Sequence, residues 1–457
     1  MACMWREAMR RKIDAQLDAW AEDDRAKPLL LRGARRVGKT YALRRLGRER
    51  FGEEHFAYCD FQTDLERLGA IFRNTSDIEG IVADLSIYLR KPIQPHMTLL
   101  AFDEIQLCEQ ALNSLRFFAN SDYRVIATGS QLGVTLRNRT LPFPSDVHQI
   151  TLHPMDFEEW LWATGDDLMA QGIRRQFDEC RNFALHDEAM ERYWRYVMVG
   201  GLPAVVDAYA QGADWHAIRE LQTDIDATYT ADIALYAPPE TVVATQSVWA
   251  SIPKQLARET TRKFKYADVR KGGRERQYRL PIAWLESAGL IVLNEQTNDL
   301  TAPLVARDGG SFFKVYMADT GLMFSRYNLD AGLWLDPQSR LQISSRFRGA
   351  LGENAVMQAL HANDVPTFYW TPDTGGAQEI EFVAQNGFGQ VIPIEVKSGT
   401  NVRATSLTRF MAKAQPPYAI RISARNFGFD NGICSVPAYA AFCVDAKALN
   451  DLAARAQ

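Results

Sequence analysis

The feature that most constrains the fold is a glycine-rich pattern near the N-terminus, G-x-x-x-x-G-K-[ST]. Residues 33–40 match it without a mismatch, directly after the short apolar run 29–31. Glycines let backbone N–H groups close around a phosphate, and the start of a following helix adds the positive end of its dipole. The pattern therefore predicts a strand, a phosphate-binding loop (residues 33–40) and a helix in immediate succession.

The residue types in this loop predict a nucleotide and a metal ion as its ligands. We expect the Lys39 ammonium to reach the β- and γ-phosphates of ATP and to act in catalysis there. The Thr40 hydroxyl is expected to bind Mg²⁺. The predicted nucleotide contacts within the loop are Gly33, Ala34, Arg35, Arg36, Val37, Gly38, Lys39 and Thr40. The alternative is a glycine turn with an incidental lysine.

A second apolar run, residues 98–102, ends in the two acids Asp103 and Glu104. In proteins that hydrolyse nucleotides with a loop of this kind, an Asp at a strand end holds the Mg²⁺ shell. We therefore expect Asp103 to bind Mg²⁺ next to the nucleotide and Glu104 to orient or deprotonate the attacking water. The alternative is a pair of solvated turn residues at a sheet edge.

A third apolar run, residues 123–128, ends in small polar residues. We expect Thr128 or Ser130 to contact the γ-phosphate or the attacking water. The alternative is a plain junction between a strand and a turn.

Strand and helix patterns alternate through the first 130 residues, which is typical of a parallel α/β sheet. Apolar runs at 29–31, 56–61, 97–102 and 123–128 are predicted strands. An amphipathic helix is expected over 5–20, before the first strand. Further helices are expected near 38–47, 78–89 and 108–119.

Taken together, the motifs resemble a widespread prokaryotic family of AAA-type ATPases whose members carry a C-terminal domain of unknown function. The segments that carry the resemblance are 33–40 (GARRVGKT), 102–106 (FDEIQ), 128–133 (TGSQLG), 154–160 (PMDFEEW), 200–203 (GGLP) and 314–322 (KVYMADTGL). The resemblance covers about residues 5–445 and implies a parallel P-loop NTPase sheet with a helical lid. A cationic finger for the γ-phosphate is also expected. Its candidates are Arg137, Arg139, Arg192 and Arg195, between which the sequence does not choose.

The same resemblance relates the C-terminal region to the PD-(D/E)xK nucleases, which have an α/β restriction-endonuclease-like fold. Glu381 on one predicted strand is followed by Glu395 and Lys397 on the next. Residues two apart on a strand point to one face, so Glu395 and Lys397 are expected to lie together. Glu381 and Glu395 would hold Mg²⁺ while Lys397 stabilises the developing charge, and Glu353 would join them from a helix.

The chain departs from that nuclease pattern at Glu381, where Asp is usual. The longer side chain moves the carboxylate by roughly 1.5 Å, and Mg²⁺ demands strict geometry. The sequence therefore leaves open an active nuclease-like site, a catalytically dead one, and a surface salt bridge on an edge strand.

The charge of the chain is unevenly distributed. The 52 Lys+Arg and 56 Asp+Glu residues give a net charge of −4, which excludes a globally basic nucleic-acid coat. Residues 254–279, however, contain ten basic and three acidic residues, a net charge of +7. The helices around them resemble a winged-helix module, which places a helix in the DNA major groove. DNA is therefore an expected partner, and the alternative is a solvated helical face or a contact with an acidic neighbouring domain.

We expect four parts: an ATPase domain (1–155), a helical lid (156–240), a winged-helix-like connector (241–300) and a nuclease-like domain (301–457) whose last strand covers 438–444. The six cysteines lie far apart without a C-x-x-C pair, which suggests a reducing compartment in which they act as small hydrophobes. No apolar run reaches membrane-span length and no secretory signal is visible, so we expect a cytoplasmic protein without a membrane partner.

These patterns predict an ATPase that couples its nucleotide state to a DNA-associated or partner-regulating C-terminal domain. Two alternatives stay open. One is a nucleotide-gated switch that acts by binding ATP, and the other is a DNA-binding protein with a catalytically dead nuclease-like domain. The sequence does not give the oligomeric state or the identity of a protein partner.

Overall fold

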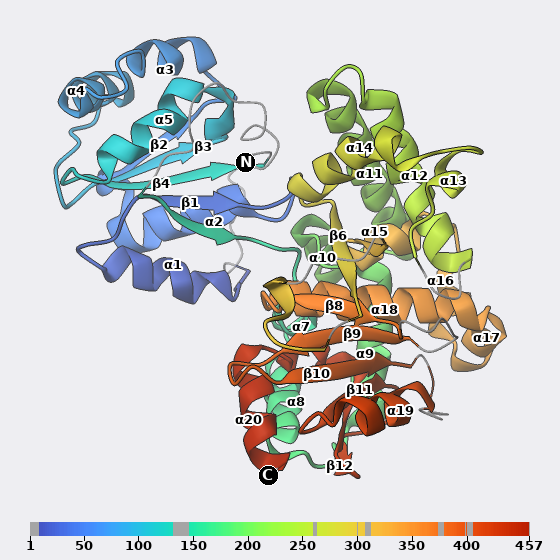
Figure 1. Ribbon diagram of the computed structural model, residues 1–457. Helices are drawn as coiled ribbons and strands as arrows, with labels where there is room; N and C mark the ends of the chain where they lie inside the picture. The colour runs from blue at the N-terminus through green and yellow to red at the C-terminus, as the bar shows by residue number, and fades with distance from the viewer. Residues whose placement is uncertain are drawn as a thin grey trace. The chain divides into compact units, whose positions relative to one another are not determined.

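The computed structural model of the chain divides into two compact units (Figure 1). The residues that it describes are 9–130, 146–258, 263–298, 300–306, 312–372, 379–397, 399 and 405–456. The N-terminal unit comprises Met1–His153 and Ser287–Gly289, and the C-terminal unit comprises Pro154–Glu286 and Leu290–Gln457. None of the described helices combines the length and apolar character that a membrane span requires.

A five-stranded parallel sheet forms the centre of the N-terminal unit, in the order β2-β3-β4-β1-β5. Its strands are β1 (Leu29–Arg32), β2 (Phe56–Asp60), β3 (Leu99–Asp103), β4 (Arg124–Gly129) and β5 (His148–Thr151). β1 lies between β4 and β5, and β3 lies between β2 and β4. The expected α/β fold class is confirmed, and because all strands run in one direction, their carboxyl ends share one edge of the sheet.

The alternation of side chains along the strands determines what each face of this sheet contacts. Its helices are α1 (Ile13–Glu22), α2 (Lys39–Leu46), α3 (Leu65–Ile71), α4 (Ile78–Leu89) and α5 (Glu109–Phe118). Leu100 and Phe102 belong to a buried apolar cluster with residues of α3, α4 and α5. Since successive strand residues point to opposite faces, Asp103 points away from this cluster.

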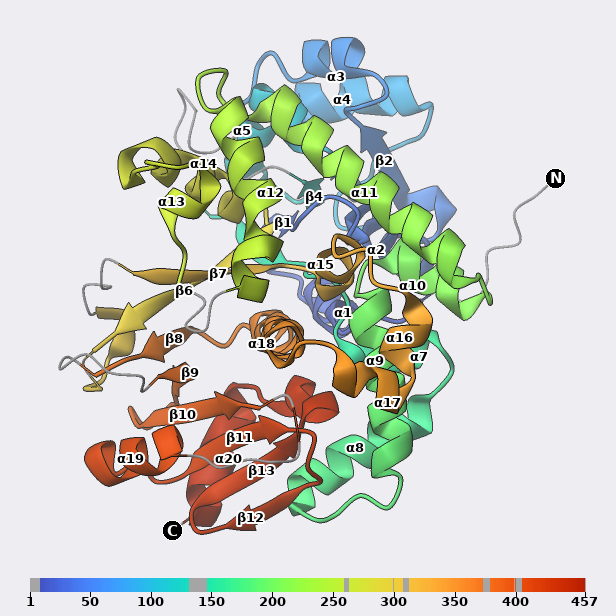
Figure 2. The same ribbon diagram turned by 90° about the vertical axis from the view of Figure 1, so that its right-hand side faces the viewer.

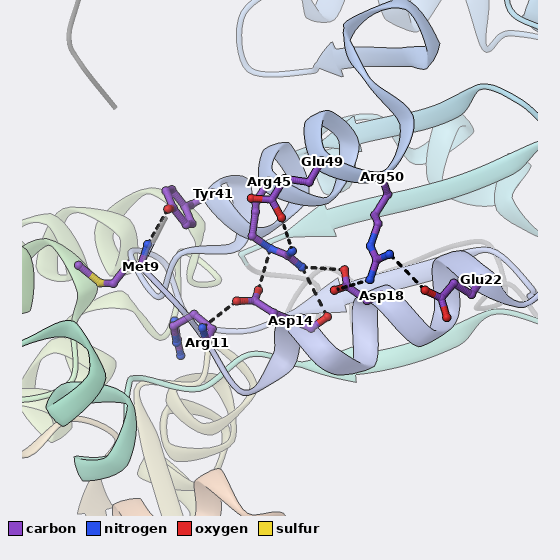
Figure 3. Close-up of polar contacts among 9 residues, drawn as sticks. All are labelled: Met9, Arg11, Asp14, Asp18, Glu22, Tyr41, Arg45, Glu49 and Arg50. Carbon is purple, nitrogen blue, oxygen red and sulfur yellow. Dashed lines mark hydrogen bonds and ion pairs between the residues drawn. The ribbon is translucent and has the colours of Figure 1, made fainter. Parts of the chain in front are cut away.

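Helix α2 starts in the phosphate-binding loop and is held against α1 by ion pairs (Figure 3). The Arg45 guanidinium lies 3.0 Å from Asp14 and 3.1 Å from Asp18 on α1. It also lies 2.8 Å from Glu49, one turn further along the chain. The Arg45 side chain is only 8% exposed, and burial raises the pKa of the Asp14 carboxyl. The ion pairs therefore connect the first helix to the helix that carries Lys39.

The helix expected over 5–20 starts later than predicted, at Ile13, and residues 1–8 lie outside the described part of the chain. Arg11 lies in the segment before the helix, and its side chain reaches two other segments. Its guanidinium donates hydrogen bonds to the carbonyl oxygens of Val37 (2.9 Å) and His153 (2.8 Å). The segment before α1 therefore packs against the phosphate-binding loop, a tertiary contact that helical periodicity does not reveal.

Replacing Arg45 by Ala is expected to lower the stability of the N-terminal unit by about 2 kcal/mol, because Asp14 and Asp18 lose a shared, largely buried cation. Hydrogen exchange of peptides from residues 13–46 measures the change. Arg67→Ala is the matched control, since the Arg67 side chain is 78% exposed and 3.8 Å from its acidic partner. Such a pair contributes less than about 1 kcal/mol. Equal protection in both variants would contradict this role of Arg45.

The C-terminal unit contains an eight-stranded mixed sheet in the order β12-β13-β11-β10-β9-β8-β6-β7 (Figure 2). The strands are β6 (Ile291–Thr297), β7 (Phe313–Met317), β8 (Thr367–Trp370), β9 (Ile380–Gln385), β10 (Val391–Val396), β11 (Ala419–Ser423), β12 (Gly428–Asp430) and β13 (Ile433–Pro437). β9 runs antiparallel to both of its neighbours, whereas β10, β11 and β13 are parallel. The two predicted strands that carry Glu381 and Glu395 are present as β9 and β10, which are antiparallel neighbours.

The strand expected over 438–444 is wrong. Along the described chain β13 is the last strand, and the following 3-10 helix Ala438–Cys443 is almost entirely buried. A short buried apolar run does not distinguish a strand from a helix by periodicity, and here Pro437 marks the change.

Helices make up the rest of the C-terminal unit. They are α7 (Phe157–Ala163), α8 (Asp167–Glu179), α9 (His186–Val199), α10 (Pro203–Ala210), α11 (Trp215–Tyr236), α12 (Val242–Arg258), α13 (Tyr266–Val269), α14 (Glu275–Ser287), α15 (Thr320–Ser325), α16 (Ala331–Leu335), α17 (Pro337–Gln342), α18 (Ser345–Ala362), α19 (Thr405–Ala414) and α20 (Ala446–Ala456). The segment 156–240, expected to be helical, contains α7 to α11. α18 packs against β7, β10 and the helices α12 and α15.

One buried carboxylate joins the helical part of this unit to its sheet. Asp319 accepts a hydrogen bond from the Gly201 N–H at 2.6 Å and another from the start of α15 at 2.8 Å. Burial raises its pKa to about 6. A Cβ on Gly200 would lie 2.5 Å from the Asp319 carboxylate, and one on Gly321 would lie 2.4 Å from a backbone oxygen. The GGLP and KVYMADTGL segments therefore form one closely packed junction.

Candidate ATP site and the C-terminal charged clusters

The phosphate-binding loop connects β1 to α2, and its backbone adopts positive φ angles that glycine favours. The φ angles of Gly33, Arg36 and Gly38 are +145°, +69° and +102°. A Cβ on Gly33 would lie only 2.2 Å from the carbonyl oxygen of Leu152. The loop therefore curls tightly before the first turn of α2, as the motif predicts.

Lys39 lies inside this curl. Its Nζ donates hydrogen bonds to the carbonyl oxygens of Gly33 (3.0 Å) and Ala34 (2.7 Å), and the residue is only 5% exposed. Burial lowers the pKa of the Lys39 ammonium to about 8, although Glu104 and Asp103 act in the opposite direction. The ammonium is thus held at the loop by backbone oxygens, and it interacts electrostatically with the carboxylates of Asp103 and Glu104.

Asp103 is held by side chains from the strands on either side of it. The Tyr58 hydroxyl on β2 donates to Asp103 Oδ2 at 2.7 Å, and the Thr128 hydroxyl on β4 donates to Oδ1. Arg44 on α2 donates to the Tyr58 oxygen at 3.0 Å. Tyr58 was not among the predicted site residues, because nothing in the sequence shows which strand lies beside β3.

Glu104 follows β3 in a left-handed conformation, with φ of +54°. The Ser130 hydroxyl donates to Glu104 Oε2 at 3.0 Å, and the Gln106 amide donates to the same oxygen. The Glu104 N–H donates to Thr128 Oγ1 at 3.4 Å. Thr128 and Ser130 were expected beside the phosphate or the water. In the structure they contact the two acids, and Gln106 is an additional residue that sequence reasoning missed.

The structure also brings together three of the four nuclease-like residues. Lys397 Nζ lies 3.5 Å from Glu381 and 3.2 Å from Glu395. The Val396 N–H donates to Glu381 Oε2 at 3.2 Å, and Arg421 Nε lies 3.7 Å from Glu395. Glu395 is 1% exposed, and burial raises its pKa against the effect of Lys397. Two cations thus accompany these two carboxylates.

The fourth residue, Glu353, makes its described contacts in a different cluster. The fully buried Lys314 ammonium lies 3.1 Å from Glu353 and 2.6 Å from Glu379, and the Tyr316 hydroxyl also donates to Glu353. No group of three or more His, Cys, Asp or Glu side chains in the described part of the chain is arranged to hold a metal ion.

The basic segment 254–279 is largely exposed where the structure describes it. Helices α12, α13 and α14 are followed by the antiparallel pair β6 and β7, and Lys263 forms an isolated bridge with Lys314 of β7. Arg274, Arg276 and Arg279 are exposed at the start of α14. Within the described residues, none of these three arginines has an acidic side chain within ion-pair distance.

The candidates for a cationic finger are only partly described. Arg192 pairs with Asp166 at 2.9 Å, and Arg195 lies 3.7 Å from Glu191. Arg137 and Arg139 lie outside the described residues.

Comparison with known proteins adds evidence for the N-terminal unit. Residues 25–161 match the family model of an AAA domain. Residues 190–332 and 348–440 match two models of domains of unknown function (DUF8612 and DUF4143). No curated protein matches the chain. Among solved structures, the chain is similar to Cdc6p from Pyrobaculum aerophilum at 12% identity and a TM-score of 0.28, over 75% of this chain and 98% of that one. At that TM-score, the similarity supports no conclusion about the fold or function of this chain.

The parallel sheet, the complete loop motif and the family match agree with one another. Residues 25–161 are similar to AAA domains and have a parallel sheet typical of P-loop NTPases. In this AAA domain the loop, the Asp103 strand end and the β4 strand end occupy the same edge of the sheet.

The depressed pKa of Lys39 predicts that nucleotide affinity of the AAA domain falls at alkaline pH. With a pKa of about 8, the ammonium is mostly charged at pH 7 and about one-tenth charged at pH 9. The dissociation constant of ATP is therefore expected to rise about tenfold between these values. Equilibrium binding of a fluorescent ATP analogue measures this change. Lys39→Ala should bind weakly throughout and lose the pH dependence, and the same dependence in that variant would refute the assignment.

Proposed function

We propose that this protein is a Mg²⁺-dependent ATPase that converts ATP to ADP and phosphate and uses its nucleotide state to regulate a DNA-associated C-terminal unit. The observation that carries the proposal is the convergence of Lys39, Asp103 and Glu104 at one edge of a parallel sheet. A phosphate cradle, a metal-binding carboxylate and a second carboxylate for water are the parts that this chemistry requires.

The residues present fit ATP and Mg²⁺. The positive φ angles of the loop and its close approach to Leu152 form a backbone cradle with no space for a side chain at Gly33. Thr40 and Asp103 would hold Mg²⁺, whose charge offsets that of the phosphates when it is bound. The Lys39 ammonium would exchange its two backbone carbonyl partners for phosphate oxygens. Their negative charge would stabilise the buried ammonium more strongly than neutral carbonyl oxygens do.

Glu104 is the proposed base for the attacking water. A carboxylate in this role must be held in one orientation, and Ser130 and Gln106 both donate to the same Glu104 oxygen. The other oxygen would then accept the proton of the water. Arg137, Arg139, Arg192 and Arg195 remain candidates for a cationic finger.

Glu104→Gln separates turnover from binding, because the amide keeps the shape of the side chain but does not accept a proton. We expect kcat for ATP to fall at least about 100-fold while the dissociation constant of ATP changes less than about threefold. Phosphate release and nucleotide binding are the two measurements. Glu66→Gln, at an exposed position on α3, is the control and should hydrolyse ATP at the normal rate.

If Glu104→Gln retained the normal turnover, Glu104 would not be the base. If the unsubstituted protein bound ATP but did not hydrolyse it, with or without DNA, the nucleotide-gated switch would replace the ATPase.

We infer that DNA binds to the basic segment 254–279. Three helices followed by an antiparallel strand pair follow the chain order of a winged-helix module. Arg274 just before α14, and Arg276 and Arg279 on α14, are exposed to solvent. In such a module, a helix of this kind enters the major groove while other basic residues contact phosphates. The strand order β8-β9-β10-β11 and the E-x-K pair at the end of β10, with Lys397 directly after the strand, support a nuclease-like relation of the C-terminal domain. The buried Lys314 that neutralises Glu353 favours binding without cleavage.

Replacing Arg274, Arg276 and Arg279 together by Ala should weaken DNA binding and its salt dependence. If each arginine contacts one phosphate, the slope of log K against log salt becomes shallower by about 2 to 3. Fluorescence anisotropy with a duplex at several salt concentrations measures it. The control replaces the exposed Arg175, Arg181 and Lys447 by Ala, which removes the same charge elsewhere in this unit. Equal slopes in the two triple variants would contradict the proposed surface. The DNA is expected to be recovered uncut with Mg²⁺ and ATP.

A further inference from the structure

The two residues that would hold Mg²⁺, Thr40 and Asp103, lie on different elements of the N-terminal unit, α2 and β3. Two other side chains connect these elements. Arg44 on α2 donates a hydrogen bond to the Tyr58 hydroxyl oxygen at 3.0 Å, and the Tyr58 hydroxyl donates to Asp103 Oδ2 at 2.7 Å. A chain of hydrogen bonds therefore runs from the helix that starts in the phosphate-binding loop to the strand end that carries the acid.

The Tyr58 hydroxyl is directed toward Asp103 by its other partner. A phenol has one O–H donor, and its oxygen also accepts hydrogen bonds. Because Arg44 has only donors and occupies the oxygen as an acceptor, the single proton of the hydroxyl is left for Asp103. The Arg44 guanidinium also lies over the Tyr58 ring, 4.5 Å from its centroid. Arg44 thus holds both the ring and the hydroxyl of Tyr58.

The positions of these residues on their elements favour the same connection. Thr40 and Arg44 are four residues apart on α2, a spacing that makes their side chains neighbours on one face of the helix. Tyr58 lies opposite Ala101 in the parallel pair of β2 and β3, so Tyr58 and Asp103 belong to one face of the sheet. Asp103 is only 3% exposed, and its orientation is therefore set by protein groups and not by solvent.

We propose that Arg44 and Tyr58 are positioning residues for Mg²⁺, which hold the Asp103 carboxylate in one orientation relative to the helix that carries Thr40. This inference rests on the proposed function, because it concerns the metal of the same ATP site. Outer residues that orient a metal-binding carboxylate contribute about 10- to 100-fold to metal affinity. Mg²⁺ demands nearly ideal octahedral geometry, whereas Ca²⁺ is bound through longer bonds in a flexible shell. The pair therefore also favours Mg²⁺ over Ca²⁺.

The test measures binding of a fluorescent ATP analogue to the full chain at increasing Mg²⁺, at increasing Ca²⁺ and in EDTA. In Tyr58→Phe, which removes only the hydroxyl, we expect the midpoint of the Mg²⁺ dependence to rise about tenfold. The Ca²⁺ midpoint should change less than about twofold, because a flexible shell accepts a displaced carboxylate. Affinity in EDTA should also change less than about twofold, since the loop and Lys39 contact the phosphates directly.

Arg44 variants test the other half of the pair. Arg44→Gln should raise the Mg²⁺ midpoint in the same direction as Tyr58→Phe. Arg44→Lys keeps a cationic donor but not the planar guanidinium over the ring, so its Mg²⁺ midpoint should lie between those of the unsubstituted protein and Arg44→Gln.

Tyr88→Phe is the matched control. It removes a hydroxyl that donates to a different carboxylate of the same unit, Asp64, at 3.2 Å, where no metal is expected. Its Mg²⁺ midpoint should equal that of the unsubstituted protein.

Three results would overturn the inference and leave the proposed function standing. They are an unchanged or lowered Mg²⁺ midpoint in Tyr58→Phe, an equal rise in Tyr58→Phe and Tyr88→Phe, and a loss of affinity in EDTA as large as that with Mg²⁺. If the unsubstituted protein bound no ATP analogue under any of the three conditions, the proposed function would fail, and this inference with it.

Discussion

A carboxylate that is removed from water must receive hydrogen bonds or a cation from the protein, and this requirement organises both units of the chain. In the AAA domain, Asp103 receives the hydroxyl groups of Tyr58 and Thr128, which fixes the strand end between its two neighbours. In the C-terminal unit, Asp319 accepts hydrogen bonds from the N–H of Gly201, in the turn before α10, and from the N–H of Leu322, at the start of α15. Each carboxylate thus connects segments that are far apart in the sequence.

The proposed ATP site is organised before any ligand enters it. Lys39 lies inside the loop with carbonyl partners that it can exchange for phosphate oxygens, and Glu104 is held by Ser130 and Gln106. Burial lowers the pKa of Lys39, so the charge that binds phosphate is costly until the phosphate arrives. Groups that are fixed beforehand lose little freedom when ligand binds, which is the physical basis for precise phosphate chemistry.

Local patterns in the sequence predicted the parts of the site that belong to one short segment. The loop motif identified Lys39 and Thr40, and the end of an apolar run identified Asp103 and Glu104. Tyr58 was missed, because its contact with Asp103 depends on β2 being the neighbour of β3. Periodicity alone also placed the first helix too early and turned the buried 3-10 helix at Ala438–Cys443 into a strand.

The sequence by itself determined the AAA domain, its phosphate-binding loop and the acidic strand end, because each of these depends on residues within a few positions of one another. Only the tertiary structure decided which side chains meet across the chain. It paired Glu353 with Lys314, and it brought Tyr58 and Thr128 to Asp103. Such long-range contacts depend on strand order and helix packing. These are determined by the burial of apolar residues over the whole unit, so they produce no motif of fixed spacing in the sequence.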